Sequence, residues 1–255
     1  MPLICRSNNP GRLGAALLAG ALALAGIAWA SKSASPDSLP DDPLQLRVLA
    51  DAGRQDAALA RLKTLAEGGS PLARRALGQV LVARGTAVRE GLGWLQQAAD
   101  GGDSEAAFQL GKLYRSGAPG VPPDAAQALR HFTAAARAGH AGAAYHLGIA
   151  WRNGYGVEPD AGEAVRWFRA SAKGGVAAAR FMLANAYREG DGVARDDAEA
   201  VRLYTEAAEQ EHPEAVQTLA MAYMNGELGL PRDPDQARHY LMETAHALKH
   251  PAQTP

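Results

Sequence analysis

The chain has 255 residues, of which 47% are hydrophobic but only 6% aromatic, so small aliphatic side chains supply most of the apolar content. The formal net charge of -1 gives no basic field that would attract nucleic acid and no strong acidic field that would attract cations. The single cysteine, Cys5, lies so close to the N-terminus that disulfides, thiolate catalysis and cysteine-based metal sites are not expected in the rest of the chain.

The N-terminal segment has the layout of a secretory signal peptide. Arg6 and Arg12 precede an uncharged stretch, residues 13–30, which ends in small residues around Trp29 before Ser31. As a helix this stretch would span about 27 Å, so an uncleaved membrane anchor is the alternative, although its many alanines and glycines favour cleavage. Both interpretations export the rest of the chain to the periplasm or the extracellular space. Contact with a membrane is expected only through residues 13–30, if they are not cleaved.

Two segments without a clear repeat follow. Residues 31–43 are rich in serine, proline and aspartate and have no apolar period, which predicts a linker. Residues 44–102 carry helical apolar spacings, including Leu77-Gly78 and the later Trp94-Leu95, and predict degenerate helical hairpins. With the repeats that follow, about six hairpins are expected in total.

Residues 103–248 contain four copies of one pattern. A leucine recurs at intervals of 37, 36 and 36 residues, at Leu110, Leu147, Leu183 and Leu219. An aspartate recurs at intervals of 36, 36 and 37 residues, at Asp124, Asp160, Asp196 and Asp233. Because the two series agree, apart from one extra residue in the first and last loops, this part of the chain is a tandem repeat, and residues 249–255 form a tail.

Each repeat has the signals of two helices. Ala106, Leu110 and Tyr114 are spaced so that they lie on one face of a helix. Glycines such as Gly117 supply the backbone angles that a helix end and a tight turn need. Asp124 then stands where an N-cap of a second helix is expected. One such hairpin cannot bury its apolar faces alone, but stacked neighbours can.

These residues resemble the Sel1-like repeat family, a relative of the tetratricopeptide repeat, over roughly residues 103–248. The family pattern runs A-x3-LG-x2-Y, then G-x-GV and D-x3-A, and the copies depart from it at Ala184, Ala220, Leu230 and Glu211. The resemblance implies an all-α, right-handed α-solenoid of stacked antiparallel helical hairpins. It also implies a role as an adaptor in protein complexes, including those of the cell envelope.

The sequence gives no pattern for catalysis, a cofactor or a metal. There is no H-E-x-x-H, no G-x-S-x-G and no phosphate-binding loop, so we expect no enzyme activity and no cofactor. His131 stands where other repeats have apolar residues, which favours packing. His246 and His250 could share a metal, but a solvated C-terminus is the simpler interpretation. The loop around Asp191 is interpreted as a turn, because it lacks the oxygen series of a calcium site.

A helical wheel of the first helix suggests a binding face. Positions two before, two after and five after the repeated leucine lie opposite the predicted core. They hold Phe108, Lys112 and Arg115; Tyr145, Ile149 and Arg152; Phe181, Asn185 and Arg188; and Gln217, Met221 and Met224. Stacking of the repeats would align Phe108, Tyr145 and Phe181 in one row and Arg115, Arg152 and Arg188 in another.

Two hypotheses for function follow from these rows. The first is an exported, non-catalytic scaffold whose concave surface binds a protein or peptide in an envelope assembly. The second is recognition of an anionic glycan or a peptidoglycan fragment through ring stacking and guanidinium hydrogen bonds. The simpler interpretation of the same residues is that the aromatic side chains pack against the neighbouring hairpin and the arginines are solvated.

Overall fold

The computed structural model describes residues 39–51, 55–85 and 87–247. The predicted signal peptide or anchor, most of the predicted linker, His250 and the predicted tail lie outside these residues. Helices make up most of the described chain: α2 (Pro43–Asp51), α3 (Gln55–Glu67), α4 (Pro71–Arg84), α5 (Val88–Asp100), α6 (Ser104–Ser116), α7 (Ala125–Arg137), α8 (Ala141–Asn153), α9 (Ala161–Lys173), α10 (Ala177–Glu189), α11 (Asp197–Ala208), α12 (Pro213–Asn225) and α13 (Pro234–Ala247).

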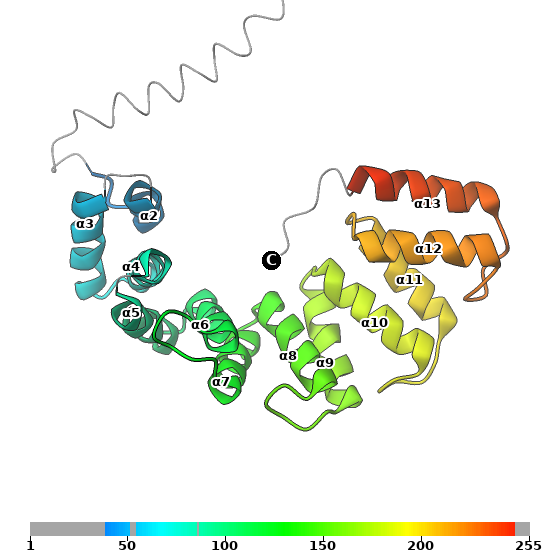
Figure 1. Ribbon diagram of the computed structural model, residues 1–255, viewed down its shortest axis with the longest axis horizontal. Helices are drawn as coiled ribbons and strands as arrows, with labels where there is room; N and C mark the ends of the chain where they lie inside the picture. The colour runs from blue at the N-terminus through cyan, green and yellow to red at the C-terminus, as the bar shows by residue number, and fades with distance from the viewer. Residues whose placement is uncertain (1–38, 52–54, 86, 248–255) are drawn as a thin grey trace, which may run out of the picture.

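Consecutive helices pair into hairpins, from α2 with α3 to α12 with α13, and each hairpin packs on the next. The pairs form an open arc, with α2, α4 and α6 nearer its inside and α3, α5 and α7 nearer its outside (Figure 1). The described residues form no strand, and their helices are all too short or too polar to span a membrane. The predicted all-α, right-handed solenoid of antiparallel hairpins is therefore confirmed.

Aspartates fix where the second helices begin. The side chains of Asp124, Asp160 and Asp196 each accept a hydrogen bond from the backbone N–H three residues later, at 2.9–3.0 Å. Such a cap contributes about 1 kcal/mol, because it satisfies a backbone donor that the helix leaves unpaired. The preceding first helices end at glycines, and Gly154, with φ 71°, shows the left-handed conformation that most side chains disfavour.

The two helices of a hairpin approach closely at a glycine. A Cβ atom at Gly148 would lie 2.5 Å from two ring carbons of Phe168, and one at Gly111 would lie equally close to the ring of Phe132. Both rings are buried. The absence of a side chain on the first helix therefore makes the space that the aromatic ring of the second helix fills.

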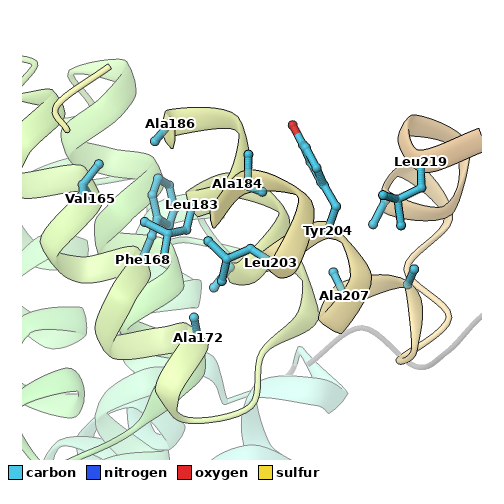
Figure 2. Close-up of a cluster of buried hydrophobic side chains, with 14 of the residues drawn as sticks. Val165, Phe168, Ala172, Leu183, Ala184, Ala186, Leu203, Tyr204, Ala207 and Leu219 are labelled. Atoms are coloured by element: carbon cyan, nitrogen blue, oxygen red, sulfur yellow. The ribbon is translucent and has the colours of Figure 1, made fainter. Parts of the chain in front are cut away.

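The repeated leucines are all buried. Leu110, Leu147, Leu183 and Leu219 are each no more than 4% exposed. Leu183 of α10 lies in one cluster with Phe168 of α9 and Leu203 of α11, so the cluster joins consecutive hairpins (Figure 2). The apolar interior is thus shared between hairpins, which explains why a single hairpin would not be stable.

The glycine contact predicts opposite effects for two glycine-to-alanine substitutions. Gly148→Ala should lower the free energy of unfolding by about 1–3 kcal/mol, because the new methyl group overlaps the Phe168 ring. Gly93→Ala should raise it by about 0.5–1 kcal/mol, because Gly93 is an exposed position inside α5 with open space around it. Urea unfolding of both variants checks this, and a Gly148→Ala variant as stable as the unmodified protein would refute the close approach.

Candidate interaction surface

The first helices expose a strip that is displaced from the one the helical wheel predicts. In α6 the buried residues are Ala106, Ala107, Phe108, Leu110 and Gly111. At about 100° per residue they cover about 200° of the helix circumference. The reason is that α6 packs against α7 of its own hairpin and also contacts α8 of the next one. Two sides of α6 are therefore covered by its neighbours.

We call one strip of residues along the first helices, which contains the predicted arginine row, the groove strip. It consists of the residues one before, two after and five after the repeated leucine in each first helix. Its members are Gln109, Lys112 and Arg115 in α6, His146, Ile149 and Arg152 in α8, Met182, Asn185 and Arg188 in α10, and Thr218, Met221 and Met224 in α12.

The predicted aromatic row is not part of this strip. Phe108 is 4% exposed, and its ring stacks on His140 with a centroid distance of 4.2 Å. It also lies 5.6 Å from the ring of His146. The expectation that Phe108 is exposed on the groove is therefore wrong, because the start of α8 covers it. Helix-wheel reasoning missed this, since it considers one helix without its neighbours.

Tyr145 and Phe181 are also covered by neighbouring side chains, but less completely than Phe108. Both are half-buried, and the ring of Tyr145 lies 6.2 Å from that of Phe168. Phe181 stacks on His212 at 5.0 Å. Burial raises the pKa of Tyr145. Phe108, Tyr145 and Phe181 form a seam between consecutive hairpins. This agrees with the simpler interpretation of the sequence, in which the aromatic side chains pack against the neighbouring hairpin.

The seam also holds polar contacts that the sequence analysis did not find. His140 caps α8 by accepting a hydrogen bond from the Ala143 N–H at 3.1 Å, and its Nε2 lies 3.0 Å from Glu105 of α6. One hairpin earlier, Arg75 stands in the position of Phe108 and pairs with the α6 cap, Asp103, at 3.4 Å. The sequence signal that could have revealed these contacts is the N-cap position, which is the residue directly before each first helix.

The arginine row does lie on the groove strip. Arg115 donates a hydrogen bond to Nδ1 of His146 at 2.8 Å, and Arg152 reaches Sδ of Met182 at 3.6 Å. Each of these exposed guanidinium groups thus bridges two consecutive first helices. Arg188 instead pairs with Glu189 of its own helix at 2.7 Å. The arginine row places positive charge along the strip, and Arg115 and Arg152 each connect two consecutive repeats.

The two remaining predicted residues have contacts within the fold. The ammonium group of Lys112 lies 5.2 Å from the centre of the Phe108 ring. Asn185 accepts a hydrogen bond from the Tyr204 hydroxyl at 2.6 Å. Burial raises the pKa of Tyr204 to about 12, so this hydroxyl stays protonated and continues to donate. Asn185 therefore supports the interior, whereas Lys112 remains partly accessible.

Two hollows open beside residues of the groove strip. One, of about 340 Å³, lies at α2, α4, α5 and α6 beside Gln109 and is lined by Arg47, Gln79, Leu95 and Leu113 among others. The second, of about 250 Å³, lies at α10 and α12 and is lined by Arg188, Thr218, Met221 and Leu228 among others. Each hollow combines a guanidinium group, apolar side chains and a carboxylate, which is Asp51 in the first hollow and Glu227 in the second. Neither was predicted, because each forms only when consecutive hairpins stack.

The described residues place no three histidine, cysteine, aspartate or glutamate side chains where they could hold a metal ion together. His131 is buried and stacks on Tyr114 with a centroid distance of 5.5 Å. Burial lowers its pKa.

Comparisons with known proteins agree with this architecture. The family model for the Sel1 repeat matches residues 87–103, 104–140, 141–176, 177–212 and 213–241. A Sel1 repeat protein from Oxalobacter formigenes is similar in structure, with a TM-score of 0.65 and 26% identity over 90% of this chain and 96% of that one. No curated protein sequence matches the chain.

Two further solved structures share the fold at lower identity. A protective antigen of uropathogenic Escherichia coli strains gives a TM-score of 0.56 and 24% identity, over 80% of this chain and 54% of that one. An immunity protein from Pseudomonas aeruginosa gives a TM-score of 0.54 and 16% identity, over 85% of each chain.

The contact between Arg115 and His146 predicts a pH dependence. Burial, together with the charges of Arg115, Lys112 and His140, lowers the pKa of His146 from 6.5 to about 4. Between these two values the unfolded chain binds a proton that the folded chain does not, so stability present above pH 6.5 is lost as the pH falls toward 4.

The variant His146→Gln removes the imidazole that binds a proton in the unfolded chain, and its amide oxygen can still accept a hydrogen bond from Arg115. Between pH 7 and pH 4.5 the unmodified protein should lose about 1–2 kcal/mol more stability than the variant, allowing for partial exposure of the ring. Urea unfolding at the two pH values checks this. Equal losses in both proteins would show that His146 is not held neutral by the fold.

Proposed function

The chain belongs to the Sel1 repeat family, whose members generally mediate protein–protein interactions, and we propose that it is a non-catalytic scaffold that binds a protein partner along the groove strip. The observation that carries this proposal is the row formed by Arg115, Arg152 and Arg188. The row runs across three consecutive first helices, α6, α8 and α10.

The same surface indicates the chemistry of the partner. The hollows near Arg47 and Arg188 each hold a guanidinium group, one carboxylate (Asp51 or Glu227) and apolar side chains, of which Met221 is 49% exposed. A polypeptide segment that alternates acidic and apolar residues would place carboxylates on the guanidinium groups and apolar side chains in the hollows. A flexible methionine suits such a contact, because it adapts to different shapes.

The glycan hypothesis has less support than the protein hypothesis. It relied on exposed ring faces for stacking, and Phe108 is covered by His140 and His146. Tyr145 and Phe181 are half-buried against neighbouring side chains. The groove strip offers guanidinium groups without an adjacent open aromatic row, which suits carboxylates on a polypeptide better than the ring of a sugar.

We further propose that the scaffold works outside the cytoplasm in an envelope assembly. The support is the sequence of the N-terminal segment, in which Arg6 and Arg12 precede the uncharged residues 13–30. This segment either is removed on export or anchors the repeats to the membrane.

Charge reversal on the groove strip tests the scaffold proposal. A variant with Arg115→Glu, Arg152→Glu and Arg188→Glu should capture the protein partner from the producing cell at least about tenfold less well, because it repels acidic groups. The control carries Arg89→Glu, Arg130→Glu and Arg137→Glu, which change the same charge on exposed positions of second helices α5 and α7.

The measurement is quantitative pull-down with parallel protein and glycan arms, after circular dichroism confirms that both variants are folded. Loss of the protein partner in the groove variant alone supports the proposal. Equal capture by both variants, or loss confined to the glycan arm, contradicts it.

The export proposal has a separate test. Sequencing of the N-terminus of the protein from its own cell should give Ser31 as the first residue, if cleavage follows Ala30. An intact N-terminus with repeats open to added protease would indicate the anchored alternative. Repeats that are protected from protease in intact cells and spheroplasts would refute export.

A further inference from the structure

A third hollow lies on a different side of the solenoid from the groove. It has a volume of about 340 Å³, and α9, α10 and α11 form it. Its lining consists of Arg169, Ala172, Lys173, Arg180, Leu183, Tyr187, Glu199, Arg202, Leu203 and Glu206.

The spacing of the α10 residues gives the direction in which this hollow opens. Arg180, Leu183 and Tyr187 are three and four residues apart, so they share one face of the helix. Asn185 and Arg188 of the groove strip lie about 200° and 140° around the helix from Leu183. The hollow therefore opens on the side of α10 away from the groove, between the second helices α9 and α11.

The hollow has more basic than acidic groups. Arg202 binds Glu199 through two hydrogen bonds, at 2.5 and 2.8 Å, and also pairs with Glu206. Arg180 lies 3.3 Å from the same Glu206. The bond from Arg202 lowers the pKa of Glu199, so its carboxylate stays ionised and paired. Two arginines thus neutralise both carboxylates of the hollow.

Two further cations line the hollow without forming an ion pair, although the charge of Arg169 helps to lower the pKa of Glu199. Arg169 donates a hydrogen bond to the Tyr187 hydroxyl at 3.0 Å, and its guanidinium lies 5.7 Å from the centre of that ring. In the described part of the chain, neither Arg169 nor Lys173 forms an ion pair with a carboxylate. Both project from α9 four residues apart, so they lie about 6 Å apart along the helix axis.

The neighbouring repeats do not have this arrangement. Positions equivalent to Arg169, Lys173 and Arg180 hold Thr133, Arg137 and Ala144 one repeat earlier, and Thr205, Glu209 and Val216 one repeat later. The basic residues are therefore not a general requirement of repeat stacking, because the adjacent hairpins stack without them.

We propose that this hollow is a second docking surface, for an acidic segment of a protein partner. Carboxylates that are two residues apart in an extended chain, or one turn apart in a helix, have a spacing close to that of Arg169 and Lys173. A single exposed ion pair contributes only about 0–1 kcal/mol, so a small free anion gains little here. A segment with several carboxylates gains from each of them at once.

The proposal is independent of the groove and gives the scaffold two binding sides. A partner on the groove strip and an acidic segment between α9 and α11 occupy different faces of α10. The chain would then hold two proteins together, as an adaptor does, instead of binding one.

The test uses the full-length chain and a fluorescein-labelled peptide of alternating glutamate and serine, with fluorescence anisotropy as the readout. The variant Arg169→Gln with Lys173→Gln should bind at least about tenfold more weakly than the unmodified protein. The matched control, Arg130→Gln with Arg137→Gln, removes the same charge from exposed positions on α7 and should bind as the unmodified protein does. All four positions are exposed, so folding of each variant is checked by circular dichroism.

A control peptide and a small competing anion distinguish the possible outcomes of this test. A peptide with glutamine in place of glutamate should not bind, and free glutarate should not compete at concentrations similar to that of the peptide. The proposal is overturned if the peptide does not bind, if the control variant weakens binding as much as the α9 variant, or if glutarate competes equally.

The groove variant with Arg115→Glu, Arg152→Glu and Arg188→Glu separates this proposal from the proposed function. It should keep the peptide affinity of the unmodified protein. If it loses the peptide while the α9 variant keeps it, the acidic segment docks in the groove and the second surface does not exist.

Discussion

Phe168 can lie against α8 only because residue 148 is a glycine, and the same contact joins Phe132 to Gly111. This close approach sets the distance between the two helices of a hairpin and the direction in which the hairpin presents its remaining apolar side chains. Those side chains are buried by the next hairpin, as the cluster around Leu183 and Leu203 shows (Figure 2). The contact recurs in two consecutive hairpins, whereas α10 and α12 have Ala184 and Ala220 at the equivalent positions.

The stacking that buries the interior also divides the first helices into a seam and a groove strip. Phe108 lies in the seam, where His140 covers it, and Arg115 lies on the strip, where it bridges to His146. Burial of the rings leaves the strip without an open aromatic row, and Arg115 and Arg152 are its exposed charged groups. The interaction surface is therefore a consequence of the packing, since each bridging arginine needs two consecutive hairpins to have its partner.

The parts of this structure that depend on local sequence could be predicted, and the parts that depend on neighbouring hairpins could not. The periods of Leu110 and Asp124 gave the helices and the solenoid, because caps and apolar stripes act within one hairpin. The wheel placed Phe108 and Arg115 on the same face, and only the position of α8 decides which of them is covered. The hollow between α9 and α11 takes residues from three helices, so no single segment carries its signal.

Deletion of one whole repeat tests most directly whether each hairpin completes the interior of the next. Removing residues 141–176, which the Sel1 repeat model matches as one unit, should leave a shorter protein that keeps its helical content per residue and unfolds cooperatively, because α10 then docks where α8 was. Removing only residues 141–158 deletes α8 without α9 and should abolish cooperative unfolding. Thermal unfolding followed by circular dichroism distinguishes the two, and a whole-repeat deletion that unfolds as poorly as the partial one would contradict the account.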